Sequence, residues 1–349
     1  MIIPETLIKI IFKFFPSSKI KNTFLSIYGD YLQRKKLLKV YEFSDIDLLI
    51  NDFPKKIKKS IDGYVLYDVM VLDDGIVRLD KYHYFISDRF TLYIVVKKLS
   101  RFRKAVRKKI LNSSFLMSGM YSNSFNLFHL ITDSIAPNYS PTLKNYHSPI
   151  LVPKIHNSFQ SDLLKKLHIK NFDATNEPVF VKELDLNLRS SKWRESNYKT
   201  IRDVLGVNIQ NKKADRRMVY ATRSGNARNY KNEKSLINFL TTYGVDIIDF
   251  SKVSLNERMQ ILGETAVLIG QYGAGLTNLI FMPDNSYIID LQTVNVHRND
   301  YCMLANACNI NYVNVPFMDR YFNNIKSYSL SKDDFYHIKV AIEFLIAKL

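Results

Sequence analysis

Cysteine is nearly absent from this chain, which holds only Cys302 and Cys308 among its 349 residues. So few cysteines in a chain of this length exclude a fold held together by disulfides. The two lie six positions apart in a stretch that we expect to be helical, and this spacing matches no common metal site. We therefore interpret both as reduced residues of the core, in a reducing compartment.

Long apolar runs are missing as well. No stretch of about 18 uncharged apolar residues occurs, so we predict no transmembrane helix. The first residues show no basic segment followed by a small-residue cleavage site, which argues against a secretory signal. We expect a cytoplasmic protein.

Acidic residues are in the minority: 33 Asp and Glu stand against 50 Lys and Arg, which gives a formal charge of +17. Such a charge favours an anionic partner, which could be nucleotide phosphate, an anionic lipid surface or nucleic acid. The hydrophobic content of 46% is ample for a large core, and the length indicates two domains.

Basic residues are concentrated near the N-terminus, where we expect residues 1–60 to form a basic, helical segment. Residues 1–15 are apolar on one side and carry Lys9 and Lys13 on the other. Such a helix could lie in an anionic membrane interface, or it could pack on its own domain. Both alternatives stay open.

Residues 61–206 are expected to form an N-terminal α/β domain. Its first part, 62–97, alternates apolar and polar residues around an Asp73-Asp74-Gly75 turn, a pattern typical of antiparallel hairpins. Alternating strands and helices follow at 148–153, 158–169 and 178–186. The polar run 207–215 is the expected linker.

One helix of this domain, within 115–135, carries His129 and Asp133 four residues apart. Both side chains therefore fall on one helix face, one turn apart. An Asp one turn from a His can act as a general base, with the His positioning it or a substrate hydroxyl. Two polar residues on an amphipathic face by chance would give the same spacing.

Residues 215–325 show a regular alternation of strands and helices, which predicts a doubly wound parallel sheet, as in Rossmann-like nucleotide-binding domains. The five expected strands are 216–224, 245–251, 266–269, 286–291 and 311–316. Ser254 and Glu257 form an S-x-x-E capping box for a helix over 255–265. A terminal helix, 331–349, is expected to pack back on the N-terminal domain.

Three glycines, Gly270, Gly273 and Gly275, follow directly after the apolar strand 266–269 and precede an apolar helical pattern. A helix N-terminus after such a turn suits a phosphate or diphosphate. The spacing is GxxGxG, which differs from the dinucleotide GxGxxG motif and from a P-loop. A tight strand–helix connection without a ligand remains the alternative.

No acidic pair stands in a metal-binding context. Asp73-Asp74 is explained by the hairpin turn and Asp333-Asp334 by a helix start. Ligands of a doubly wound sheet bind outside the carboxyl ends of its strands, where the glycine turn and Thr222-Arg223 are both expected to lie.

Together, these segments resemble glycosyltransferase family 61. The resemblance rests on the HxxxD helix, the VYATRS strand followed by Arg228 and NE (232–233), the SLNERMQIL helix and the VLIGQYGAGLTNLIFMPDNSYIIDL unit. It covers roughly residues 115–315 and is strongest over 216–292. It implies a GT-B architecture with two Rossmann-like domains facing a cleft, and an inverting transfer that requires no metal.

By this resemblance, the donor phosphates are expected at the GAGLTN turn, which comprises Gly273, Ala274, Gly275, Leu276 and Thr277. The family commonly has His directly before this turn, whereas this chain has Tyr272. A tyrosine hydroxyl can hydrogen-bond a phosphate or a sugar, but it supplies no cation at neutral pH.

The resemblance also implies roles for five further residues. Arg223 and Arg228 match basic residues after the first strand of the family's C-terminal domain, where they would neutralise the diphosphate. Asp290 stands where the family usually has Glu, and could accept hydrogen bonds from ribose. His129 and Asp133 match the HxxxD segment and are the candidate catalytic residues.

We therefore interpret the chain as a glycosyltransferase that takes a nucleotide sugar, with a UDP-sugar favoured, and a glycan or lipid-linked glycan acceptor. The basic N-terminus fits a bacterial enzyme of capsule or lipopolysaccharide synthesis, in the cytoplasm or peripheral on the inner face of the plasma membrane. A NAD-dependent oxidoreductase is one alternative, although the glycine spacing opposes it. A basic, non-catalytic nucleic-acid-binding protein is another, although no binding module is recognisable, and we expect no nucleic-acid partner.

Overall fold

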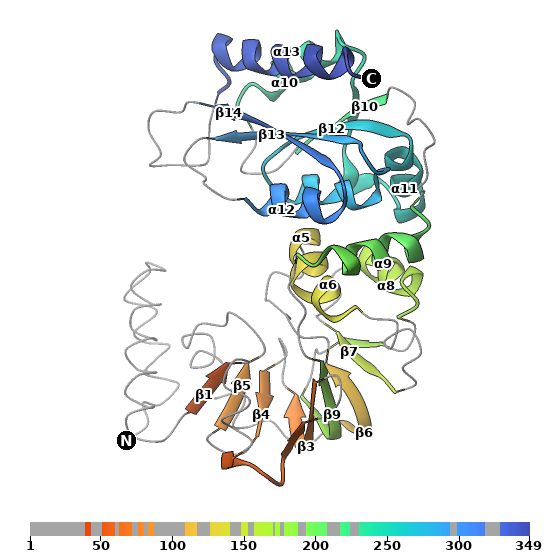
Figure 1. The fold of residues 1–349 in the computed structure, drawn as a ribbon, viewed down its shortest axis with the longest axis vertical. Helices are drawn as coiled ribbons and strands as arrows, with labels where there is room; N and C mark the ends of the chain where they lie inside the picture. Colours follow the sequence, from red (N-terminus) through yellow and green to blue (C-terminus); the bar gives the residue numbers. More distant parts are fainter. Residues whose placement is uncertain are drawn as a thin grey trace.

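The computed structural model describes residues 39–42, 51–59, 63–71, 76–79, 83–86, 109–116, 126–139, 148–152, 157–169, 172–174, 178–187, 193–207, 217–223, 230–293, 299–317 and 329–349. Within them the protein is an α/β structure with two sheets and a layer of helices between the sheets (Figure 1). Arg228, the helix expected over 1–15, the Asp73-Asp74 turn and most of the 207–215 linker lie outside the described residues.

The C-terminal sheet has five strands, all parallel, in the order β11-β10-β12-β13-β14. The strands are β10 (Arg217–Ala221), β11 (Asp246–Ile248), β12 (Thr265–Gln271), β13 (Tyr287–Thr293) and β14 (Asn311–Phe317). This confirms the parallel, doubly wound sheet. Because β10 lies between β11 and β12, the direction of strand addition reverses there, and such a switch point is where these sheets bind ligands.

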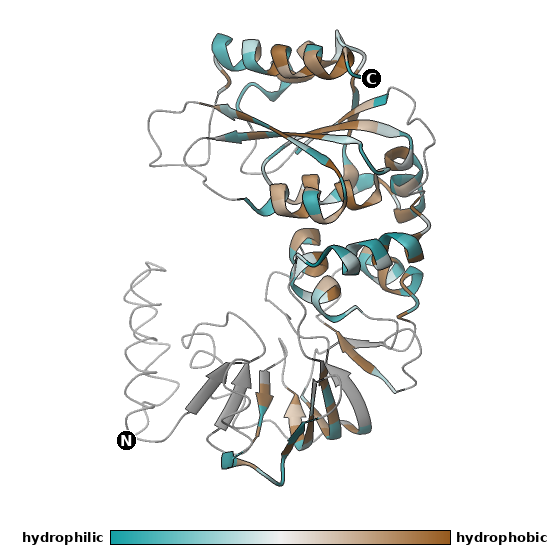
Figure 2. Ribbon diagram, viewed as in Figure 1, coloured by the Kyte–Doolittle hydropathy of each residue, from teal (hydrophilic) through white to brown (hydrophobic). Residues whose placement is uncertain are grey.

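Helices cover both faces of this sheet (Figure 1). On one face lie α10 (Glu233–Thr241) and α13 (Lys332–Ile346), and on the other α11 (Leu255–Gly263), α12 (Asp300–Ala307) and the 3-10 helix η5 (Ala274–Phe281). Every residue of β12 is buried, as expected for a strand covered on both faces. Figure 2 shows its apolar residues in brown, and alternate side chains reach opposite helix layers.

The terminal helix α13 lies elsewhere than expected. It packs on β14 and α10 of the C-terminal sheet, far from the N-terminal domain in Figure 1, and the rings of Phe335 and Phe239 approach to 5.3 Å. Its buried face, which includes Ile338 and Ile342, covers sheet surface that α10 leaves open. The capping box of Ser331 and Asp334 starts this helix, as Ser254 and Glu257 start α11.

The N-terminal sheet is mixed, with the order β1-β5-β4-β3-β9-β6-β7-β8 and with β2 paired to β3. Its strands are β1 (Lys39–Glu42), β2 (Ile57–Lys59), β3 (Gly63–Val71), β4 (Ile76–Arg78), β5 (His83–Ile86), β6 (Lys109–Leu116), β7 (Ile150–Val152), β8 (Phe172–Ala174) and β9 (Val179–Asn187). The expected antiparallel hairpins are confirmed by the pairs β3–β4 and β4–β5.

Two features of this sheet differ from expectation. Strand β9 runs antiparallel to β3 and parallel to β6, so the hairpins and the α/β part form one mixed sheet in place of a separate Rossmann-like domain. Strands β1 and β2 lie within the segment 1–60 that we expected to be helical. Ile57 on β2 is buried against the neighbouring strands, and this long-range packing is invisible in local sequence.

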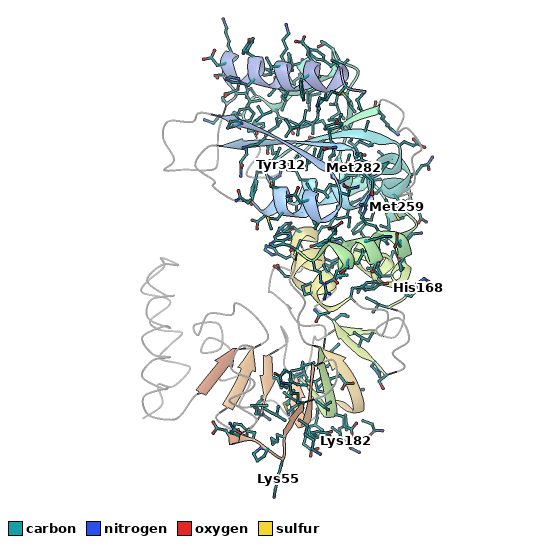
Figure 3. All side chains as sticks on the ribbon, in the orientation of Figure 1. Lys55, His168, Lys182, Met259, Met282 and Tyr312 are labelled. Atoms are coloured by element: carbon teal, nitrogen blue, oxygen red, sulfur yellow. The ribbon has the colours of Figure 1, made fainter. Side chains whose placement is uncertain are left out.

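The layer between the sheets consists of α5 (Leu127–His129), the π-helix η3 (Leu130–Ile135), α6 (Ala136–Asn138), α8 (Ser158–Lys166) and α9 (Glu195–Leu205). These helices share one apolar core with α11, α12 and η5. Arg202 of α9, which is 3% exposed, donates to the carbonyl oxygens of Met282 at 2.6 Å and of Cys308 and pairs with Asp284 at 2.8 Å. Met282, labelled in Figure 3, directly follows η5. The two halves of the molecule are therefore joined by packed apolar surface and by a buried charge.

Cys302 and Cys308 are both free, and Cys308 is buried, which raises the pKa of its thiol to about 12. This agrees with the expectation of an unreactive core residue for Cys308, whereas Cys302 is only partly buried and does not belong to the core. None of the helices in the described part of the chain is long and apolar enough to cross a membrane.

Candidate functional site

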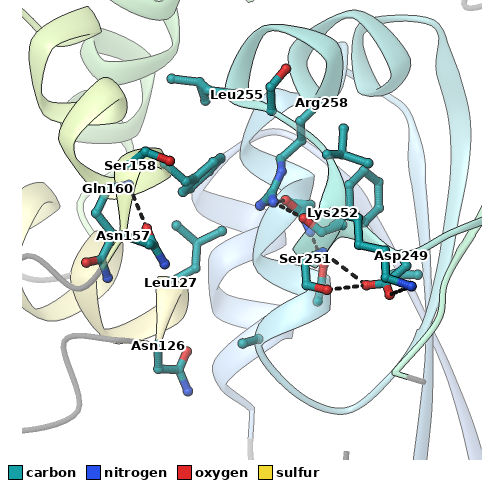
Figure 4. A pocket seen from close by; sticks show the side chains of 18 of the residues that line it. Asn126, Leu127, Asn157, Ser158, Gln160, Asp249, Ser251, Lys252, Leu255 and Arg258 are labelled. Carbon is teal, nitrogen blue, oxygen red and sulfur yellow. Dashed lines mark hydrogen bonds and ion pairs between the residues drawn. The ribbon is translucent and has the colours of Figure 1, made fainter. Parts of the chain in front are cut away.

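A pocket of about 800 Å³ opens between the helix layer and the switch point of the C-terminal sheet (Figure 4). On one side it is lined by Asn126, Leu127 and residues 157–160, at the starts of α5 and α8. The other side comprises residues 221–223 after β10, residues 249–255 after β11, Arg258, Ala274, Gly275 and Asn278. Both halves of the molecule thus contribute walls, at the edge where a parallel sheet binds its ligand.

The residues after β10 are held by a buried carboxylate, that of Glu233. The hydroxyls of Tyr220 and Thr222 and the backbone N–H of Arg223 all donate to its Oε1, at 3.1, 2.8 and 3.2 Å. Glu233 is the first residue of α10, where the helix dipole favours a negative charge. This carboxylate fixes the direction in which the chain leaves the strand, and so places Arg223 at the pocket.

The Arg223 side chain lies against the glycine turn. Its Nη1 donates to the Tyr272 carbonyl oxygen at 3.2 Å. A Cβ atom at Gly273 would stand 2.6 Å from Nη2 of Arg223, and Gly273 has φ 154° and ψ −177°, a conformation essentially restricted to glycine. The Arg223 guanidinium therefore lies in space that a side chain at position 273 would enter.

The segment after the turn, η5, is a 3-10 helix and not the expected α-helix. The N–H of Leu276 bonds back to Gly273, so the N–H groups of Ala274 and Gly275 come before the first bond within the helix. Both residues line the pocket. The turn therefore presents backbone donors beside the Arg223 cation, which is the arrangement that suits an anion.

Tyr272 directs its side chain toward α12. Its hydroxyl donates to Asp300 at 2.7 Å, and its ring packs edge-on against Tyr301, with ring centroids 5.0 Å apart. Its backbone carbonyl oxygen accepts the hydrogen bond from Arg223. A hydrogen bond from Tyr272 to a ligand stays a prediction.

The remaining residues of the predicted donor site lie deeper. Leu276, Thr277 and Asp290 are each fully buried, and Leu276 packs on Gly270. Asp290 accepts a hydrogen bond from Tyr312 at 2.8 Å (Tyr312 is labelled in Figure 3), and burial raises the pKa of its carboxyl to about 7. The structure thus places Arg223, Ala274 and Gly275 at the pocket, with Gly273 against the Arg223 guanidinium, and places residues 276, 277 and 290 behind them. The contact of Asp290 with ribose stays a prediction.

His129 and Asp133 share a face, as their spacing predicts, and are in direct contact: Nδ1 of the imidazole lies 2.6 Å from Oδ2 of Asp133. The His129 side chain is 30% exposed and that of Asp133 14%. The helix begins at Asn126, whose side chain accepts from the N–H of Phe128, and Asn126 and Leu127 line the pocket. The pair therefore lies within the first two turns of a helix whose start forms a pocket wall.

Two residues of the site escaped the sequence interpretation. Glu233 was visible only as part of the NE dipeptide at 232–233. Arg258 is buried between Phe159 and Phe250 and donates to the Asn278 side chain. It lies between Leu255 and Leu262 on the buried face of α11, and a cation on an apolar helix face was the signal that could have identified it.

Comparison with known proteins agrees with the geometry. A family model described as Glycosyltransferase 61 matches residues 5–289. Relatives named EGF domain-specific O-linked N-acetylglucosamine transferase, from Bos taurus and Mus musculus, are 31% identical over 102 residues, and that from Gallus gallus is 30% identical. The matched segment is 28% of this chain and spans only 19% of the length of these relatives. The match of the family model over most of the sequence shows that the chain belongs to glycosyltransferase family 61, a family of glycosyl-transferring enzymes.

Proposed function

We propose that this chain is an inverting, metal-independent glycosyltransferase that moves a sugar from a nucleotide-sugar donor to a glycan acceptor. The observation that carries this proposal is the contact between Arg223 and Gly273 at the switch-point pocket. It sets a fixed cation beside the free N–H groups of a helix start, where a diphosphate would be held.

On the donor side, the protein must stabilise the negative charge that develops on the departing diphosphate. Preorganised donors in a site sheltered from water do this well because they need no reorganisation during the reaction. Arg223 supplies a full charge, and Ala274 and Gly275 supply backbone N–H groups. The proposal includes Arg228 as a second cation beside the same group. The metal independence of the proposed reaction rests on these groups.

On the acceptor side, inversion requires a base that removes the proton of the acceptor hydroxyl as the hydroxyl oxygen attacks the anomeric carbon. Asp133 is the proposed base, and His129 holds its carboxylate through the 2.6 Å contact. The attacking oxygen forms the new glycosidic bond while the bond from the anomeric carbon to the diphosphate breaks, and the proton passes to Asp133.

A parallel C-terminal sheet and a mixed N-terminal sheet, with a pocket between the halves, support as part of this proposal a GT-B-like arrangement in which only the C-terminal half is Rossmann-like. A UDP-sugar is the favoured donor, and the names of the curated relatives make UDP-N-acetylglucosamine the first sugar to test. Capsule or lipopolysaccharide is the proposed product, made in the cytoplasm or at the inner face of the plasma membrane with a glycan or lipid-linked glycan as acceptor.

The proposal is tested by release of the nucleotide from the donor, which is a diphosphate for UDP- and GDP-sugars and CMP for CMP-sugars. The purified chain is incubated in EDTA with a panel of UDP-, GDP- and CMP-sugars, with and without glycan acceptors, and the free nucleotide is measured. Release from one donor that increases with an acceptor supports the proposal. Turnover that appears only when a divalent metal is added contradicts its metal-independent part, and oxidation of a substrate with NAD in place of any transfer contradicts the whole.

A further inference from the structure

A buried cation in the pocket wall has no role in the proposed function so far. Arg258 of α11 is 7% exposed and lines the pocket. Figure 4 shows its side chain reaching from the helix toward the centre of the pocket, past Leu255 and toward Ser251 and Lys252. Within the described part of the chain, its guanidinium forms no ion pair with a carboxylate.

An unpaired buried charge is unfavourable unless other groups compensate it. Burial lowers the pKa of Arg258 to about 10, so the guanidinium is still charged at neutral pH. It is compensated in part by the aromatic rings of Phe159 and Phe250, whose centroids lie 4.0 and 5.3 Å from its Cζ. Neutral contacts of this kind leave the positive charge itself without a counter-charge.

The guanidinium also has hydrogen-bonding capacity to spare. A guanidinium carries five N–H groups. Nη1 donates to Oδ1 of Asn278 at 3.0 Å, Nη2 donates to the Phe250 carbonyl oxygen, and Nε has no partner in the described structure. These contacts hold the planar group in one orientation, and one N–H on each terminal nitrogen remains for a further acceptor.

We propose that Arg258 is a further anion-binding residue of this pocket, which receives a phosphate or a carboxylate group of the donor substrate. The proposal rests on the proposed function for the identity of that substrate. A nucleoside diphosphate leaves with more than one negative charge, so a further cation in the same pocket, in addition to Arg223 and the proposed Arg228, matches the leaving group. The carboxylate of an acidic sugar is the other source of the same chemistry.

A purely structural role is the competing explanation, because the Phe159 contact joins α8 to α11 across the two halves of the molecule. The two explanations differ in what they predict for ligands. A structural strut supports the fold and leaves the affinity for anions unchanged once the protein is folded. Replacement of an anion-binding residue changes the affinity for charged ligands and leaves the affinity for neutral ligands unchanged.

The test is isothermal titration of the full chain with pyrophosphate, UDP, uridine, UDP-glucose and UDP-glucuronate. The variants are Arg258→Met, which keeps the apolar stem, and Arg258→Lys, which keeps the charge and loses the fork. Arg217→Met is the matched control, because Arg217 is an arginine of the same domain that pairs with Asp246 and Glu264 at the opposite end of β10. It removes one positive charge away from the pocket.

If the group bound is a phosphate, Arg258→Met weakens pyrophosphate and UDP binding by about tenfold to a hundredfold, leaves uridine unchanged, and Arg258→Lys is intermediate. If it is a sugar carboxylate, pyrophosphate and UDP are unaffected, and the preference of the wild type for UDP-glucuronate over UDP-glucose is lost. Arg217→Met matches the wild type in either case. Thermal melting identifies any variant that fails to fold. If Arg258→Met does not fold, the ligand affinities of Arg258→Lys are compared with those of the wild type in its place.

This inference is overturned if all folded Arg258 variants bind the nucleotides as the wild type does and keep its preference between UDP-glucuronate and UDP-glucose. The proposed function is unaffected by that result. If the wild type binds none of the nucleotides, the proposed function fails. The binding of pyrophosphate then tests the anion site at Arg258 independently of the proposed function. Pyrophosphate binding that Arg258→Met loses supports the anion site. Pyrophosphate binding that survives the change, or that is absent from the wild type, overturns it.

Discussion

The guanidinium of Arg223 occupies the space that a side chain at Gly273 would need. A Cβ atom there would lie 2.6 Å from Nη2 and 2.9 Å from Cζ of Arg223. The two residues are 50 positions apart and follow the neighbouring strands β10 and β12, and the glycine conformation lets the cation approach the turn. The basic residue after β10 and the glycine turn, each a weak signal in the sequence, thus lie together in one anion-binding arrangement. A substitution at either residue is therefore expected to affect anion binding.

Replacing Arg223 by Ala should weaken the binding of the donor nucleotide by about tenfold to a hundredfold, because a charge-assisted hydrogen bond is lost. The half-buried side chain donates to the backbone carbonyl oxygen of Tyr272 and is not part of the apolar core, so the midpoint of thermal unfolding should stay within a few degrees of the wild type. Titration calorimetry and thermal melting check both. Unchanged affinity in the folded variant would remove Arg223 from the donor site.

Replacing Gly273 by Ala should lower the free energy of unfolding by about 1–3 kcal/mol and reduce nucleotide binding, because the backbone conformation is strained for alanine and Arg223 must move. Gly263→Ala is the control, since a Cβ at Gly263 meets nothing within 4 Å. It should change stability by less than about 1 kcal/mol and leave binding intact. Denaturant unfolding and calorimetry of both variants separate the local effect from a general one. A Gly273→Ala protein as stable and as tight-binding as Gly263→Ala contradicts the turn geometry.

Replacing Asp133 by Asn should keep donor binding and slow sugar transfer by about a hundredfold or more, because the proposed base loses its ability to take a proton. Asp203→Asn, at an exposed position on α9, is the control for the loss of one negative charge. The readouts are transfer to the acceptor and nucleotide affinity. If Asp133→Asn transfers at the wild-type rate, the base is elsewhere, and His129 becomes the first residue to test.

The buried Asp290 carboxyl predicts a pH dependence of stability. Its pKa of about 7 in the folded protein lies above the value of about 3.9 in an unfolded chain. The folded protein therefore binds the proton more tightly than the unfolded chain does. The stability that this group contributes is fully present below pH 4 and is lost as the pH rises to about 7.

This dependence is measured as the difference in thermal midpoint between the wild type and Asp290→Asn, which cannot ionise at this site. The wild type should lose stability relative to the variant from pH 4 to about pH 7, and the two curves should run parallel above pH 8. Asp203→Asn should follow the wild type throughout. Parallel curves for Asp290→Asn over the whole range would show that Asp290 ionises normally in the folded protein.

Much of the C-terminal sheet was predictable because its strands are short apolar runs that end at glycines or caps. The capping box of Ser254 and Glu257 is present with both hydrogen bonds, and His129 and Asp133 meet because helix geometry fixes their distance. In each case a few neighbouring residues determine the structure, which is what local sequence can show.

The features that the sequence did not predict have a different physical origin, because they depend on contacts between residues that are distant in the chain. The buried face of α13 shows that this helix packs on something, but which surface it covers depends on how much of the sheet α10 leaves open. The pattern of 274–281 fits an α-helix and a 3-10 helix alike. Arg258 is buried because Phe159 of another helix covers it. No local pattern contains these partners.

The central claim is that the pocket beside Arg223 and Gly273 binds the nucleotide of a glycosyl donor without a metal. It is tested most directly by calorimetric titration of the purified chain with UDP, CMP, GDP and NAD in turn, in the presence of EDTA. The account predicts saturable binding of one donor nucleotide, with UDP favoured, and its loss in Gly273→Ala. Binding of NAD alone, or nucleotide binding that appears only when a divalent metal is added, would contradict it.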